Sequence, residues 1–139
     1  MVKYSNVDIE QITSSDSLSV SVDETGLIYL TFHTKDLSDH QNIELSAEVR
    51  GVYEIIKEKY PVQRFSILVD LTDAGNPSNK AAEMYIKTLS DSRIKKVAIY
   101  GMGGAIESIV RFIVAAAGKG EEVKFFIDKD EALHWLRQQ

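Results

Sequence analysis

The stretch Phe65-Ser66-Ile67-Leu68-Val69-Asp70 decides the fold, because two further stretches of the same kind follow it along the chain. They are Ile94-Lys95-Lys96-Val97-Ala98-Ile99-Tyr100 and Val123-Lys124-Phe125-Phe126-Ile127-Asp128, and each ends in a turn that precedes a helical pattern. Nearly continuous runs of β-branched and aromatic residues are typical of strands whose two faces are both covered by helices. Strands of this kind alternating with helices predict an α/β fold.

Two more strands and a long helix are predicted before these stretches. Residues 18–22 and 27–32 alternate apolar and polar side chains around a turn that contains Gly26, which is typical of a β-hairpin. Residues 38–60 then repeat apolar side chains at spacings of three and four, which predicts an amphipathic helix that Pro61 ends. The stripe consists of Leu45, Val49, Val52, Ile56 and Tyr60.

Helix caps complete the predicted order. Asn76 before Pro77 suggests an N-cap for a short helix over residues 77–90, and Asp128 with Glu131 suggests a capping box for the last helix. The order is β-β-α-β-α-β-α-β-α, a single mixed sheet flanked by helices, antiparallel at the hairpin and parallel in the second half. Residues 18–139 form one domain, and residues 1–17 are either an edge strand or a loose N-terminal extension.

Composition excludes several classes of function. A net charge of −5 argues against binding to nucleic acid and against attraction to anionic lipid. The chain has no cysteine, so it has no disulfide and no thiolate chemistry. The first residues do not resemble a signal peptide, and no apolar run reaches the length needed for membrane insertion. We therefore expect a cytoplasmic protein.

Loops after the carboxyl ends of parallel strands form the crevice where open α/β sheets bind ligands. The first loop carries Asp70, Thr72, Asp73 and Asn76, followed by Ser78. Two carboxylates near a helix N-terminus suit acid–base or metal chemistry. The alternative is structural, with Asp73 and Asn76 forming a turn and a cap while Asp70 accepts bonds from the backbone.

The second loop is rich in glycine and contains Gly101, Met102 and Gly103 ahead of a predicted helix. Backbone amides in such a loop can approach an anion. The dinucleotide fingerprint fails, however, because Ile106 occupies the position of its third glycine. The alternatives are a site for a smaller anion and a tight turn.

The helix predicted over residues 105–117 is apolar almost all round. Its predicted core stripe comprises Ile106, Ile109, Val110, Ile113 and Ala117, and further apolar residues lie beyond the stripe: Phe112, Val114, Ala115 and Ala116. A neighbouring helix, a partner subunit or an apolar ligand can cover this surplus. We expect a homodimer that uses Phe112.

No catalytic constellation is found in the sequence. His33, His40 and His134 are scattered without the spacing of metal ligands, and neither a nucleophile elbow nor a P-loop occurs. We expect no catalytic residue, no metal site and no cofactor.

Four blocks in the second half resemble the SpoIIAA-like family, which comprises small bacterial and archaeal proteins of the STAS group, also grouped with the CRAL-TRIO lipid-binding fold. The blocks are residues 67–73, 96–101, 123–126 and 130–136, within a resemblance that covers about residues 18–137. The resemblance implies a shared fold more than a shared function.

One departure from the resembled antagonists of anti-sigma factors bears on function. They carry an Asp-Ser-Ser-Gly phosphorylation motif, where this chain reads Asp73-Ala74-Gly75-Asn76-Pro77-Ser78. Kinase-driven partner switching is therefore not expected. The sequence predicts a non-enzymatic binding or regulatory module that acts through a protein partner. The alternative is a small carrier or sensor of an apolar or amphipathic, lipid-like molecule.

Overall fold

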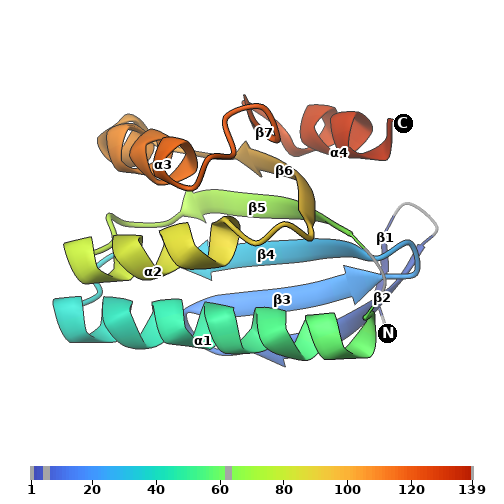
Figure 1. Ribbon diagram of the computed structural model, residues 1–139, viewed down its shortest axis with the longest axis horizontal. Coiled ribbons are helices and arrows are strands. Elements are labelled where there is room, and N and C mark those ends of the chain that lie inside the picture. The colour runs from blue at the N-terminus through green and yellow to red at the C-terminus, as the bar shows by residue number, and fades with distance from the viewer. Residues whose placement is uncertain (1, 5–6, 62–63, 139) are drawn as a thin grey trace.

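The computed structural model describes residues 2–4, 7–61 and 64–138. Within them the chain forms one mixed sheet and four helices (Figure 1). The strands are β1 (Val2–Tyr4), β2 (Val7–Ser14), β3 (Leu18–Asp23), β4 (Leu27–His33), β5 (Phe65–Asp73), β6 (Ile94–Tyr100) and β7 (Val123–Phe126). The helices are α1 (Asp39–Lys59), α2 (Asn79–Leu89), α3 (Gly104–Ala116) and α4 (Lys129–Arg137).

The strands lie in the sheet in the order in which they occur along the chain, from β1 to β7. Pairing is antiparallel from β1 to β4 and parallel from β4 to β7. The predicted mixed sheet and the predicted order of elements after residue 18 are therefore confirmed. Before that point, β2 pairs with β3, and β1 pairs with β2.

The sequential order determines which face each helix covers. Crossovers between parallel strands are right-handed, and α1, α2 and α3 all connect strands that advance in the same direction across the sheet. The three helices therefore share one face, where α2 lies beside α1 and also contacts α3 (Figure 1). The last helix, α4, follows the final strand and covers part of the opposite face.

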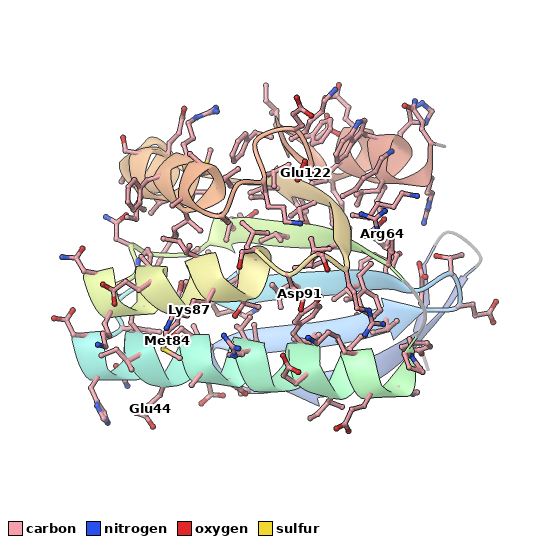
Figure 2. The ribbon with its side chains drawn as sticks, in the orientation of Figure 1. Glu44, Arg64, Met84, Lys87, Asp91 and Glu122 are labelled. Atoms are coloured by element: carbon pink, nitrogen blue, oxygen red, sulfur yellow. The ribbon has the colours of Figure 1, made fainter. Side chains whose placement is uncertain are left out.

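The two faces pack differently against their helices. On the α4 face, Ala98 of β6 and Ala132 of α4 are completely buried, so the helix lies close on the sheet. The other face bears large aliphatic side chains of the strands and of α1, with Phe65 and Ile56 almost completely buried. The Ser46 hydroxyl of α1 lies 2.7 Å from the Ile43 carbonyl and 3.1 Å from Met84 Sδ of α2, so these two helices are in contact at Met84, which Figure 2 labels.

Two features of the helices differ from the prediction, the start of α2 and the buried face of α3. Ser78, not Asn76, is the N-cap of α2, and its hydroxyl accepts from the Ala81 amide at 3.3 Å. Serine and asparagine are equally good caps, so two candidates two residues apart could not be separated by preference alone. In α3, Val114 is buried although the prediction placed it beyond the core stripe.

Other predicted features of the helices are confirmed. Leu45, Val49, Val52 and Ile56 of α1 are all buried. Asp128 is the N-cap of α4, and its carboxylate accepts from the Glu131 amide at 2.9 Å. Among the described residues, no helix combines the length and the apolar character that a membrane span requires.

Candidate functional site

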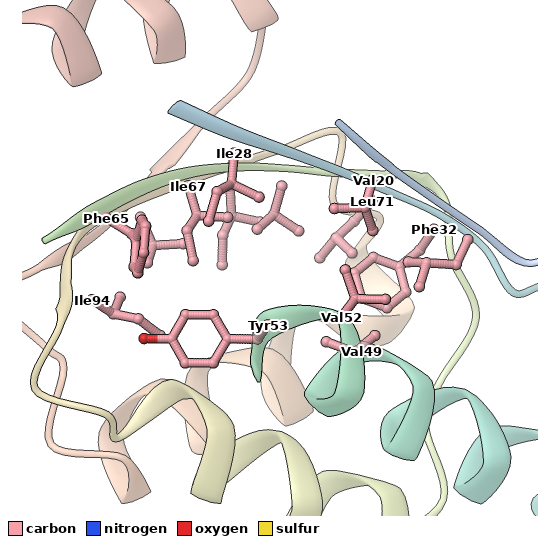
Figure 3. Packing of buried hydrophobic residues seen from close by; sticks show 14 of the residues in the cluster. Val20, Ile28, Phe32, Val49, Val52, Tyr53, Phe65, Ile67, Leu71 and Ile94 are labelled. Atoms are coloured by element: carbon pink, nitrogen blue, oxygen red, sulfur yellow. The ribbon is translucent and has the colours of Figure 1, made fainter. Parts of the chain in front are cut away.

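A cavity of about 180 Å³ lies between the sheet and the layer formed by α1, α2 and α3. One side of the cavity consists of core-facing side chains of β3 to β6, and the other consists of side chains from the three helices. Figure 3 shows part of this packing, with the strands above and the α1 side chains Val49, Val52 and Tyr53 below. Protein interiors are packed to nearly crystalline density, and voids larger than a water molecule are few. A space of this size is therefore a feature of the fold that needs an explanation.

The lining of the cavity is almost entirely apolar and includes no charged side chain among the described residues. Its hydroxyl and amide side chains come from Thr34, Asn42, Tyr53, Tyr85 and Thr88. Each helix lines the cavity with its apolar stripe, which in α1 includes Val49, Val52 and Ile56. The site can accept an apolar molecule, and it provides no ionic partner for a charged one.

Tyr53 is the most buried of the tyrosines on this face, with 6% of its surface exposed. Its ring packs edge-on against Phe65 with 5.9 Å between the ring centroids, and Lys57 Nζ lies 5.2 Å from its ring. Burial, and then the nearby Asp91 carboxylate, raises the pKa of the Tyr53 hydroxyl, so it is a neutral donor at physiological pH. Sequence reasoning missed this residue, although its spacing from Val49 and Ile56 places it on the apolar stripe.

The first predicted loop begins later than expected, because β5 extends to Asp73 and therefore includes Asp70 and Thr72. Asp70 accepts from the Thr72 amide at 2.9 Å. Burial raises the pKa of Asp70, but hydrogen bonds from Thr72 and Tyr100 and the charge of Lys129 together hold it below the ordinary value. Thr72 is exposed and lies against Gly101 of the second loop.

Asp73 is the last residue of β5, and its side chain is exposed. Its carboxylate is 3.3 Å from His33 Nδ1 and 3.4 Å from Lys35 Nζ. A hydrogen bond from His33, and then one from Lys35, lowers the pKa of Asp73. Asn76 is exposed, and Ser78 caps α2. The structure thus brings Asp73 to a histidine and a lysine, and away from Asp70.

The glycine loop packs tightly against the first loop. Gly101 has a φ of +77°, and a Cβ added there would lie 2.8 Å from the Thr72 amide nitrogen, so this position requires glycine. Met102 packs against the edge of the main core, while Gly103 is the N-cap of α3 and makes no side-chain cap. Within the described residues, no group of three or more acidic or histidine side chains is placed to hold a metal.

The nine predicted site residues lie outside the lining of the apolar cavity. Asp70 instead borders a smaller polar pocket of about 160 Å³ on the α4 face, with Tyr100 and Lys129. Phe112 projects from the outer surface of α3 with 59% of its surface exposed. The neighbouring loop residues Ala74, Gly75 and Pro77 do line the cavity, so the first loop borders one end of it.

Comparison with known protein families identifies a match over most of the chain. A family model described as SpoIIAA-like matches residues 27–137, from β4 to the last turn of α4. No curated protein matches the chain. The matched region includes the three helices that roof the cavity and four of the strands beneath them.

Proposed function

The chain belongs to the SpoIIAA-like family, which indicates a regulatory or binding module, and we propose that it binds a small, uncharged apolar molecule. The observation that carries the proposal is the apolar cavity of about 180 Å³ between the sheet and α1 to α3. An engineered cavity of roughly 150 Å³ lined by leucine, isoleucine and phenylalanine binds benzene, so this space is large enough for a substituted ring or a short branched chain. A long lipid chain exceeds it.

We propose further that the module is not an enzyme. General acid–base catalysis needs a titratable group within hydrogen-bonding reach of the reacting atoms. The described residues that line the cavity include no carboxylate, histidine or lysine, which supports binding without chemistry. A location in the cytoplasm stays a prediction from the sequence.

Titration of the purified protein with isopropylbenzene, followed by methyl NMR, tests the proposal. We expect saturable shifts at methyl groups that line the cavity, such as those of Leu45, Val69 and Val110. Ile55 lies on the outer side of α1 with 57% of its surface exposed, and its methyl groups are the internal control. Shifts that are equal at Ile55 and in the cavity, or that do not saturate, would contradict the proposal. Native mass spectrometry of protein purified from its own host then identifies the natural ligand.

A second candidate function is interaction with a protein partner, and the partner we propose is a second copy of the chain. The exposed ring of Phe112 supports it, because a large aromatic side chain on the outer side of a helix is typical of interface cores. Other residues of α3 argue against a large interface. Ile106, Ile113 and Val114 are buried within the chain, so Val114 is not part of an exposed apolar surface as the sequence had suggested.

Sedimentation of wild type and Phe112→Glu at tens of micromolar separates the two states. A homodimer that uses α3 predicts a wild-type dimer and a monomeric variant with unchanged circular dichroism. Ile55→Glu, at an equally exposed apolar position on α1, is the matched control and should leave the dimer intact. A wild-type monomer would exclude the dimer.

A further inference from the structure

The hydroxyl of Tyr53 is the unusual polar atom of the apolar cavity. It is completely buried, and none of the described residues forms a hydrogen bond with it. Figure 3 shows the ring lying beneath Phe65 and Ile28, with the hydroxyl pointing toward Ile94 at one end of the cluster. Buried hydroxyls in folded proteins nearly always have a partner, so an exception calls for an explanation.

The nearest polar neighbour does not supply the missing bond. Asp91, in the loop between α2 and β6 (Figure 2), lies close enough for its charge to affect Tyr53. A polar contact with the Asp91 carboxylate contributes to the raised pKa of Tyr53, but it lacks the geometry of a hydrogen bond. Two other donors orient that carboxylate, because Lys57 Nζ donates to Oδ2 at 2.8 Å and the Arg93 amide donates to Oδ1 at 2.8 Å.

Other polar groups in the lining differ from Tyr53 in this respect. The Thr34 hydroxyl accepts from the Gly75 amide at 3.0 Å, and the Asn42 amide group donates to the Ser38 carbonyl at 3.1 Å. The Thr88 hydroxyl donates to the carbonyl one turn earlier in α2 at 3.1 Å. Tyr85, the remaining hydroxyl of the lining, is only partly buried. Tyr53 therefore carries the lining hydroxyl that is both completely buried and without a hydrogen bond among the described residues.

We propose that the Tyr53 hydroxyl is the polar anchor of the ligand, and that the ligand is an apolar molecule with one uncharged oxygen acceptor, such as a ketone, an ether or an ester. This inference rests on the proposed function and adds the chemical class of the ligand. The tyrosine ring is already fixed by Phe65 and Lys57, so little freedom is lost when the bond forms.

An ionised ligand does not fit the same site. The described lining contains no lysine, arginine or histidine, and a carboxylate held there would be buried without a counter-ion. Near the Tyr53 end, the negative charges of Glu54 and Asp91 are matched by the positive charges of Lys57 and Arg93, all outside the lining, so no unpaired cation faces a bound anion. A single neutral acceptor satisfies the hydroxyl without introducing a charge.

The test compares two probes of nearly equal shape, acetophenone and isopropylbenzene, on the wild type, Tyr53→Phe and Tyr29→Phe. Tyr29 is the matched control, because its buried hydroxyl already donates to Asp23 at 2.9 Å and it belongs to the α4 face. The measured quantity is the ratio of the two dissociation constants in each protein. The difference in hydrophobicity between the probes enters every ratio equally, so it cancels when the ratios of two proteins are compared.

We expect Tyr53→Phe to lower the preference for acetophenone about fivefold relative to wild type, the effect of one net hydrogen bond. Tyr29→Phe should leave the ratio unchanged. If both probes bind and the ratio is the same in all three proteins, the anchor is wrong while the binding function stands. If neither probe binds to the wild type, the proposed function fails and the anchor fails with it.

Discussion

Filling the cavity from α1 should make the protein more stable and abolish ligand binding. Val52 is buried, lines the cavity and lies next to Tyr53, so Val52→Phe directs a ring into the unfilled space. At about 24 cal/mol per Å³, a cavity of about 180 Å³ represents about 4 kcal/mol of packing free energy relative to a fully packed core.

The ring recovers only part of that sum. Burial of the additional carbon atoms contributes about 2 kcal/mol, and imperfect fit against the cavity walls costs about 1 kcal/mol. We therefore expect the free energy of unfolding to rise by about 1 kcal/mol, which corresponds to about 4 °C in Tm for a domain of this size. The assay is urea unfolding with and without isopropylbenzene, which should stabilise the wild type only.

Ile55→Phe is the control on the same helix. Ile55 is 57% exposed and lies outside the cavity, so the change should alter stability by less than about 0.5 kcal/mol and leave probe binding intact. If Val52→Phe destabilises the protein by about 2 kcal/mol or more while Ile55→Phe does not, the space cannot accept a ring, and the packing argument is refuted.

Three further changes test the framework around the cavity. Burial raises the pKa of Asp91, but hydrogen bonds from Lys57 and the Arg93 amide outweigh it and hold the pKa below the ordinary value. The ionised carboxylate therefore stabilises the fold fully above a pH of about 4. This contribution is lost as the pH falls through the lowered pKa. Asp91→Asn should flatten the acid side of a plot of unfolding free energy against pH; an unchanged slope would exclude the role. Gly101→Ala should cost at least about 2 kcal/mol in urea unfolding, given its positive φ. Asp128→Ala should cost about 1 kcal/mol by the same assay, and no loss would mean that the cap is dispensable.

The sequence was sufficient for the parts of the fold that local patterning controls. Continuous apolar runs marked β5, β6 and β7 because strands covered on both faces have no polar side to show. The apolar stripe of α1 could be predicted because residues such as Leu45 and Ile56 recur with the helical period. The cap of α2 was misplaced from Ser78 to Asn76, because both residue types cap helices well and only backbone geometry separates them.

The cavity could not be predicted in the same way. In the sequence, each wall of the cavity has the pattern of an ordinary buried helix or strand. Whether the side chains of two such elements fill the space between them depends on the distance between helix and sheet, and no local pattern encodes that distance. The loops were the natural place to search, because open α/β sheets bind ligands at their strand ends. In this chain those loops engage one another, as the contact between Gly101 and Thr72 shows.

The sequential order of the strands explains why the apolar cavity lies on the face that carries three helices. Three successive crossovers place three helices over the same side of the sheet, where α1, α2 and α3 must pack against one another as well as against the strands. A helix that contacts both a neighbouring helix and the sheet cannot optimise every contact, whereas α4 has no other described helix beside it on its face and packs closely on Ala98. The close contact of α4 and the cavity beneath the other helices thus follow from one topology. The proposed ligand site then depends on two features of this face, a small side chain at Val52 and a hydroxyl of Tyr53 without a hydrogen bond among the described residues.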